Sequence, residues 1–251
     1  MTDLLSSLRA RLSAGQTCVG AWQTTPSAKV ADAMASCGFH WLAVDLEHST
    51  ISLEQAETCF IAAERHGVAP LARLSSADPF MGRRLLDAGA LGLLVPVVED
   101  AAAFAAFAQH CFYTGKRGAG LSRCNGYGDD FDAYYQGFRP LLIPQVETRK
   151  GVEAALSLAA MPEVDALFLG PYDLSADLGT PGDFTTPAFR QMAEKVRQAC
   201  AAHGKALGIH QVKPVAKELK ARVAEGYRFI AYSTDIIAMR AALGSPLESL
   251  E

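Results

Sequence analysis

Short apolar runs alternate with longer segments of helical period almost from one end of the chain to the other. The short runs are rich in Val, Leu, Ile and Ala at successive positions, as expected for strands that are buried on both faces of a parallel sheet. Eight runs are predicted to be strands: residues 18–22, 41–45, 68–73, 91–96, 141–146, 166–169, 206–209 and 229–232. Eight segments are predicted to be helices: residues 27–36, 53–66, 79–88, 101–111, 149–159, 187–203, 214–225 and 235–243.

Proline and glycine support these boundaries. Pro79 and Pro187 stand near predicted helix starts, and a glycine follows five of the predicted helix ends, which is the usual placement of these two residues. Eight strand and helix units in 251 residues predict a (β/α)8 TIM barrel, taken as a single domain over residues 1–251. A doubly wound open sheet is the main alternative. It is disfavoured because Gly20-Ala-Trp-Gln23, rather than a GxGxxG turn, ends the first strand.

Composition narrows the class of protein. Half of the residues are apolar, 20% are charged, and the net charge is −4, which gives no electrostatic footprint for nucleic acid. The six cysteines are scattered without a CxxC pair, which favours buried free thiols in a reducing compartment. Residues 1–12 resemble an amphipathic helix rather than a signal peptide, and no run approaches the roughly 18 apolar residues of a membrane span. We expect a cytoplasmic protein without a membrane or nucleic-acid partner.

Two carboxylates stand where apolar strands end. Glu147 directly follows the strand at 141–146, and Asp173 lies just past the strand at 166–169. Carboxylates are preferred ligands of hard divalent cations, and barrel active sites form at the carboxyl ends of the strands. This pair therefore predicts a metal site. Further polar or aromatic residues follow strand ends on the same rim: Trp22, Gln23, Asp45, Glu47, His48, Arg73 and His210.

Each rim residue also has a purely structural explanation. His48 could cap the following helix, and Arg73 could pair with Asp45 or Glu47 as part of the scaffold. Asp87, near a predicted helix end, opposes the helix dipole and calls for a compensating partner. The joint occurrence of these residues on one rim favours function.

Two loops carry further candidates. Gly170 and Pro171 tighten a turn and begin a short helix, whose backbone N–H groups could receive a carboxylate or phosphate of the substrate. The long segment 115–128 carries Lys116, Arg117 and Arg123, which would suit a lid facing an anion, because long loops in compact domains are often functional. A solvated surface excursion explains that segment equally well.

Four segments together resemble the HpcH/HpaI family of metal-dependent class II aldolases, in particular the branch acting on 4-hydroxy-2-oxo-heptanedioate and 2-keto-3-deoxy sugar acids. They are residues 41–48 (WLAVDLEH), 86–96 (LDAGALGLLVP), 145–148 (QVET) and 168–175 (FLGPYDLS). The resemblance runs in order from about Gly20 to Leu243. It implies a (β/α)8 barrel assembled as a homo-oligomer, a hexamer or a trimer, with C-terminal helices exchanged between subunits.

The resemblance also implies roles for matching positions. The metal ligands fall on Glu147 and Asp173, and the metal would be Mg²⁺, Mn²⁺ or Co²⁺. The implied activity is cleavage of a 4-hydroxy-2-oxo acid to pyruvate, or a related 2-oxo acid such as hydroxypyruvate, and an aldehyde, together with the reverse addition. The remaining matches are His48 as the catalytic histidine, Asp87 as its dyad partner, Arg73 as a catalytic and substrate-binding arginine, and Trp22 and Gln145 as substrate-binding positions. From their own place in the sequence, we expect further substrate-binding residues at Gly170, Pro171, Tyr172, His210 and Arg123.

A Schiff-base mechanism has little support, because no lysine ends a predicted core strand. The chain departs from the family pattern at 111–118, at His210-Gln211 and at 231–235. We expect His210 to reach the acceptor pocket and to favour a polar or acidic aldehyde, although a hydrogen-bonded rim histidine is the simpler interpretation.

Two other functions remain open from the sequence. An acyl-CoA lyase of the malyl-CoA or citryl-CoA type would need an extended surface for the CoA tail, which the short chain does not favour. A non-catalytic barrel that binds keto acids is disfavoured by the full set of rim residues.

Overall fold

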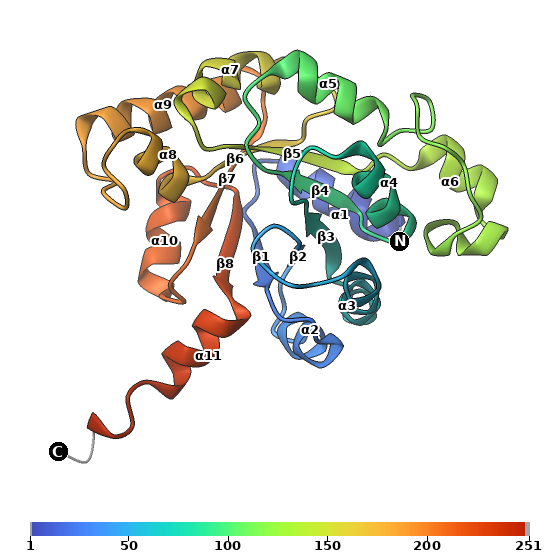
Figure 1. The fold of residues 1–251 in the computed structure, drawn as a ribbon, viewed down its shortest axis with the longest axis horizontal. Coiled ribbons are helices and arrows are strands. Elements are labelled where there is room, and N and C mark those ends of the chain that lie inside the picture. Colours follow the sequence, from blue (N-terminus) through green and yellow to red (C-terminus); the bar gives the residue numbers. More distant parts are fainter. Residues whose placement is uncertain (1, 249–251) are drawn as a thin grey trace.

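The computed structural model describes residues 2–248, and its centre is a closed barrel of eight parallel strands in sequence order. Figure 1 shows the helices arranged around these strands. The strands are β1 Cys18–Gln23, β2 Trp41–Asp45, β3 Ala69–Arg73, β4 Gly92–Val95, β5 Leu141–Val146, β6 Ala166–Leu169, β7 Ala206–Gln211 and β8 Phe229–Thr234. The helices are α1 Thr2–Ser13, α2 Ala28–Ala35, α3 Leu53–Arg65, α4 Pro79–Asp87, α5 Ala101–Gln109, η1 Arg123–Gly128, α6 Phe131–Gly137, α7 Arg149–Ala160, α8 Pro171–Asp177, α9 Pro187–Ala202, α10 Ala216–Ala224 and α11 Asp235–Leu243.

The predicted (β/α)8 barrel is confirmed, and every predicted strand is present within one or two residues. The largest differences lie at β7 and β8, which each continue two residues further than their apolar runs. The extension makes His210 part of β7 rather than of the following loop. The segment 115–128 is also not wholly irregular, because it ends in η1 and is followed by the unpredicted helix α6.

Large rings in the barrel occupy the space left by the glycines of β1 and β7. Trp41 on β2 stacks on Phe229 on β8, with ring centroids 4.2 Å apart. Gly20 on β1 lies between these strands, and a Cβ atom there would stand 1.9 Å from the Trp41 ring. Gly208 on β7 makes the same kind of room for Phe168 and Phe229. Phe168 in turn packs on Trp22, with ring centroids 5.9 Å apart. The row of packed rings therefore extends to the carboxyl ends of the strands.

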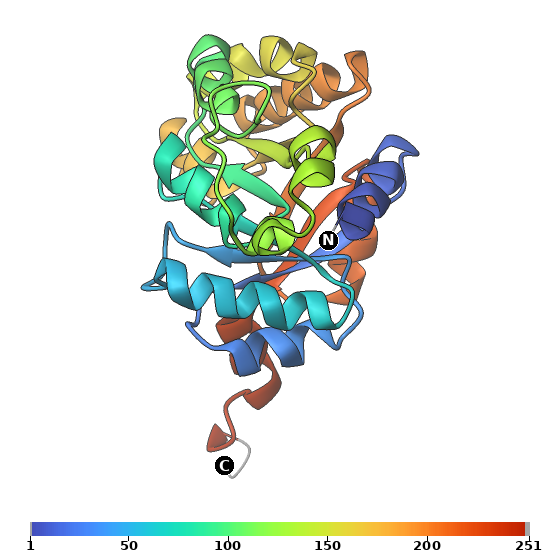
Figure 2. The ribbon, with the colours of Figure 1, turned by 90° about the vertical axis from the view of Figure 1, so that its right-hand side faces the viewer.

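The amino and carboxyl ends of the chain behave differently. α1 packs on the barrel through Leu5, Leu8 and Leu12, which are buried, and Arg9 pairs with Asp165 at 2.8 Å. By contrast, α11 projects from the barrel body in both views (Figures 1 and 2). No helix within residues 2–248 has the length and apolar character needed to cross a bilayer.

The cysteines follow the expectation from the sequence. All six are free thiols, and five of them are buried, with Cys37 the exposed exception. Burial raises the pKa of the Cys18 thiol to about 11, so this thiol is held as an inert, uncharged group.

Replacing Gly20 with Ala should destabilise the barrel, because the added methyl group overlaps the Trp41 ring. We expect the free energy of unfolding to fall by about 3 kcal/mol, as measured by urea denaturation. Gly137→Ala is the matched control, since no atom lies within 4 Å of a Cβ at that position. A Gly20→Ala protein with the wild-type urea midpoint would show that the ring stack has room to move.

Candidate active site

A buried ion pair organises the carboxyl ends of β1, β2 and β3. Asp45 is 1% exposed, and it accepts hydrogen bonds from Arg73 Nε at 2.9 Å and Arg73 Nη2 at 2.5 Å. The indole Nε1 of Trp22 donates to the same carboxylate at 3.1 Å. Burial alone would raise the pKa of Asp45, but the hydrogen bonds and charge of Arg73, with the bond from Trp22, hold it below its usual range. The carboxylate is therefore charged, and its three side-chain hydrogen bonds hold it in place.

Asp45 also shapes the loop that follows β2. Its Oδ1 accepts the backbone N–H groups of Glu47 at 2.9 Å and His48 at 3.2 Å. The Glu47 carboxylate then lies 2.9 Å from Arg73 Nη1. Thus the scaffold pairing that the sequence left open for Arg73 is present with both acids.

The backbone of His48 is anchored to Asp45, whereas its side chain extends into solvent. Its side chain is 70% exposed, and Nε2 lies 3.9 Å from Glu47 Oε1. It does not cap α3, because Ser52 fills that role by accepting from Gln55 N–H. An exposed imidazole beside the rim is suited to exchanging protons with a bound molecule.

Glu147 is a buried carboxylate held by two donors. It is 3% exposed, its Oε1 accepts from Val97 N–H at 2.6 Å, and its Oε2 accepts from Gln145 Nε2 at 2.5 Å. Gly170 allows the close approach of β6, since a Cβ there would stand 2.5 Å from Oε2. Burial raises the pKa of Glu147, and the charges of Asp173 and Glu47 raise it further.

Asp173 lies in the first turn of α8, which begins at Pro171 after the N-cap Gly170. Its side chain is exposed. Tyr172 is also exposed and sets its ring edge-on to Phe184 at 5.1 Å. The negative charge of Asp173 contributes to the raised pKa of both Glu147 and Glu47. Within residues 2–248, no group of three or more His, Cys, Asp or Glu side chains is already arranged around a single metal position.

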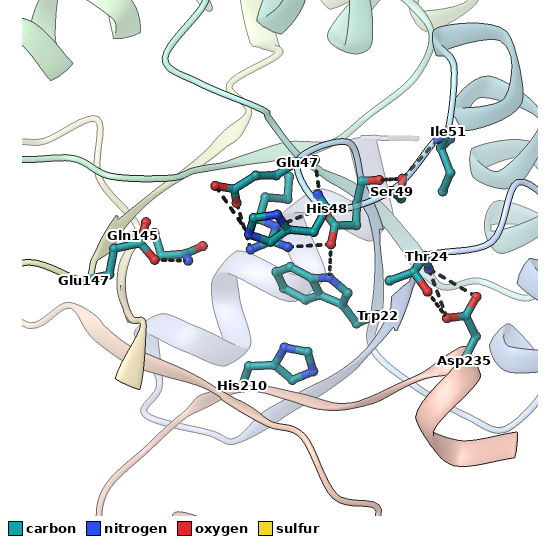
Figure 3. Close-up of polar contacts among 12 residues, drawn as sticks. Trp22, Thr24, Glu47, His48, Ser49, Ile51, Gln145, Glu147, His210 and Asp235 are labelled. Atoms are coloured by element: carbon teal, nitrogen blue, oxygen red, sulfur yellow. Dashed lines mark hydrogen bonds and ion pairs between the residues drawn. The ribbon is translucent and has the colours of Figure 1, made fainter. Parts of the chain in front are cut away.

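His210 lies on the other side of Trp22. Its ring stacks on the indole with centroids 4.9 Å apart, and its Nε2 lies 3.2 Å from the backbone carbonyl of Ser233. Burial lowers the pKa of His210 to about 4. Figure 3 shows Trp22 between the Glu47–His48 turn and His210.

Asp87 does not meet His48 within one chain. α4 runs from the carboxyl end of β3 back to the amino end of β4, so Asp87, its last residue, stands at the opposite end of the barrel. There it pairs with Arg117 at 2.7 Å. The Arg117 guanidinium is itself buried over the ring of Tyr113.

Arg123 is also placed away from the rim. It pairs with Glu64 at the end of α3 and donates to the Ala88 carbonyl at 3.0 Å. The expectation of a lid facing the substrate is therefore wrong for the arginines of segment 115–128 within a single chain. Their side chains instead pair with carboxylates and donate a hydrogen bond to a backbone carbonyl at the amino ends of β3 and β4, next to the carboxyl ends of α3 and α4.

The structure adds residues that were not among the predicted site. Asp45 and Glu47 are among the rim residues that the sequence places together, but the only individual role it offers them is a scaffold pairing with Arg73; their position at a strand end beside His48 is the signal for a larger role. The sequence gives no sign of the roles of Val97 and Ser233, because each contacts a site residue through a backbone group. Both residues adopt the left-handed conformation, with φ angles of 50° and 63°. Such conformations are rare for residues other than glycine and are not encoded by residue type.

Known proteins resemble this chain along nearly its whole length. A hydroxypyruvate/pyruvate aldolase of Chromohalobacter salexigens is 35% identical over 233 residues, 91% of each chain. A 5-keto-4-deoxy-D-glucarate aldolase of Salmonella paratyphi C is 31% identical over 241 residues, which cover 94% of this chain and 93% of that protein.

Solved structures agree with these relatives. The crystal structure of an HpcH/HpaI aldolase/citrate lyase family protein from Burkholderia cenocepacia superposes with a TM-score of 0.91 at 30% identity, covering 97% of this chain and 98% of that one. The sequence itself matches the family described as HpcH/HpaI aldolase/citrate lyase over residues 19–242. The chain therefore belongs to the HpcH/HpaI aldolase/citrate lyase family.

Proposed function

We propose that this protein is a class II aldolase that cleaves 4-hydroxy-2-oxo acids to pyruvate or hydroxypyruvate and an aldehyde, and catalyses the reverse addition with a divalent metal. The observation that carries the proposal is the buried Glu147 carboxylate, whose pKa is raised by burial and by the negative charges of Asp173 and Glu47. The aldolase names of its relatives agree with this chemistry.

The residues around Glu147 fit a hard divalent cation. In the described part of the chain Glu147 makes no ion pair with Lys, Arg or His. Two nearby acids raise its pKa further, and the buried Oε1 of Gln145 lacks a hydrogen-bond partner. A buried negative charge without a counter-charge is costly. Carboxylate and amide oxygens are ligands that Mg²⁺ and Mn²⁺ prefer, and we assign the ligand roles to Glu147 and Asp173.

A bound divalent cation would supply Lewis-acid stabilisation of the negative charge that develops when a 2-oxo acid loses a proton next to its keto group. Arg73 would bind the oxygens of that donor. Two of its three nitrogens carry a second hydrogen beyond those facing Asp45 and Glu47, and the paired acids keep the guanidinium from turning away. This fixed positive charge orients the donor without needing to reorganise.

His48 would exchange the proton of the aldol hydroxyl group. Its imidazole is exposed at the rim, while its backbone is anchored to Asp45, so the ring can turn toward a bound acceptor. Asp87, the partner implied by the family resemblance, stands at the far end of the same barrel. If Asp87 acts on His48, it acts on the His48 of a neighbouring subunit.

A homo-oligomer also agrees with the shape of the C-terminus. α11 projects from the barrel body (Figure 1) and leaves Ile236, Met239 and Leu243 exposed. We infer that this helix packs on a second copy of the chain, because removing an exposed apolar helix face from water is favourable.

The central step is testable without knowing the aldehyde. With Mg²⁺ or Mn²⁺, the protein should exchange the methyl protons of pyruvate for deuterium, as followed by proton NMR. Glu147→Ala should reduce that rate by about 100-fold or more, since the variant loses a metal ligand. Retention of exchange by Glu147→Ala would refute the metal assignment. Cleavage of an acyl-CoA thioester in place of a 4-hydroxy-2-oxo acid would refute the aldolase assignment.

Glu147→Gln should stabilise the metal-free protein at pH 7. The pKa of Glu147 is raised in the folded state, so the ionised carboxylate costs stability above the unfolded-state pKa, and that cost vanishes at lower pH. In EDTA we expect a gain of about 1 kcal/mol at pH 7 that disappears below about pH 4. Gln145 can turn its unpartnered oxygen toward the new amide.

Glu153→Gln, on the exposed face of α7, is the matched control for that measurement and should show no gain. Added Mn²⁺ should raise the unfolding temperature of the wild type and not of Glu147→Gln. If metal-free Glu147→Gln is less stable than the metal-free wild type at pH 7, the claim that Glu147 carries a buried charge without a counter-charge is wrong.

Co-expression tests whether Asp87 acts across subunits. His48→Asn and Asp87→Asn should each be nearly inactive in aldol cleavage, yet mixed oligomers should regain about a quarter of the wild-type activity, the share of sites with both partners intact. The experiment requires that Asp87→Asn still folds, because it loses the Arg117 pair. Mixed oligomers with no more activity than the mean of the two parents would rule out a shared site.

A further inference from the structure

The surroundings of His210 determine which of its nitrogens carries hydrogen. Its Nε2 lies 3.2 Å from the Ser233 carbonyl oxygen, and a carbonyl oxygen can only accept a hydrogen bond. Nε2 must therefore donate. Burial also lowers the pKa of the imidazole to about 4, so near pH 7 the ring is neutral and its Nδ1 carries a lone pair.

The backbone of β8 is bent to present that carbonyl. Gly20 on β1 is aligned with Ala231, whereas Trp22 is aligned with Thr234, so β8 carries an extra residue at this point. Ser233 lies in this bulge at φ 63° and is buried. A left-handed serine inside a strand is an uncommon arrangement. Here it directs a main-chain acceptor at a side chain of the neighbouring strand.

The lone pair on Nδ1 of His210 is left without a donor in residues 2–248, where the ring nitrogens make one hydrogen bond, that of Nε2 with the Ser233 carbonyl. One face of the ring is fixed by Trp22, whose indole also carries the Arg73 guanidinium 4.9 Å from its centroid. His210 is one of the residues that line a cavity of about 740 Å³, which also touches Pro171 and Tyr172 and has much of its remaining lining on α9 and α10. The unpartnered Nδ1 thus belongs to a side chain that lines open space.

We propose that Nδ1 of His210 accepts a hydrogen bond from a hydroxyl group of the acceptor aldehyde, so that the enzyme selects hydroxyaldehydes over alkyl and carboxylate-bearing aldehydes. This inference rests on the proposed aldolase function. A neutral imidazole with a lone pair gains nothing from a carboxylate, which has no hydrogen to donate. The prediction from the sequence of a polar or acidic aldehyde is thereby narrowed to the hydroxylated class.

The test compares glycolaldehyde with propanal, which replaces the hydroxyl by a methyl group of similar size. With pyruvate and Mn²⁺, the ratio of their kcat/KM values should fall by about tenfold in His210→Leu, the typical effect of removing one hydrogen bond. His210→Asn, whose amide oxygen can take the place of Nδ1, should keep the ratio within about threefold of wild type. His203→Leu, an exposed histidine after α9, is the matched control.

A second measurement does not depend on activity. In protein labelled with ¹⁵N-histidine, one imidazole should remain neutral with hydrogen on Nε2 down to about pH 5, and its signals should be missing from His210→Asn. Absence of such an imidazole overturns the proposal.

Two further kinetic outcomes would also overturn it. One is an unchanged glycolaldehyde-to-propanal ratio in His210→Leu, and the other is a His210-dependent preference for succinic semialdehyde. If wild-type protein exchanges the protons of pyruvate but gives either result, only the role of His210 fails. If it exchanges none, the aldolase assignment itself fails.

Discussion

The contact between Asp45 and Arg73 is the interaction on which the rest of the site depends. It joins β2 to β3, receives the indole of Trp22 from β1, and anchors the turn that carries Glu47 and His48. A buried ion pair is stabilising only when its geometry is good and its remaining hydrogen-bonding positions are filled. Here the carboxylate accepts five hydrogen bonds. Because these partners come from separate strands, the same contact that holds the barrel mouth together also fixes the position of the Arg73 guanidinium at the rim.

The fold could be predicted from the sequence because its signal is repeated eight times. Each short apolar run followed by a helical segment gives the same answer, and errors of one residue at the ends of β3 and β4, or of two residues at the ends of β7 and β8, do not change the topology. The rim residues of β2, β3 and β5 follow from the same rule, since a residue after a parallel strand must stand at the carboxyl end of the barrel.

The remaining site features could not be predicted from the sequence, because they depend on which end of the barrel a segment packs against and on local backbone conformation. Arg123 follows a long segment with no strong periodicity, so nothing in its neighbourhood indicated that it would pack beside Glu64. Asp87 matched a family position, but only the direction of α4 shows that it faces the opposite end of the barrel. Val97 and Ser233 act through N–H and C=O groups that every residue type carries, and their unusual φ angles are set by the surrounding barrel.

The glycines of the barrel interior have a consequence for how such a sequence can change over time. Gly20 and Gly208 leave room that the rings of Trp41, Phe168 and Phe229 occupy from the flanking strands. A larger residue on one strand is therefore acceptable only when a ring on the next strand becomes smaller, since the interior is already closely packed. Among homologues, these positions should covary in pairs across neighbouring strands. Trp22 would be the least free to exchange, because its ring both packs on Phe168 in the interior and donates a hydrogen bond to Asp45 at the rim.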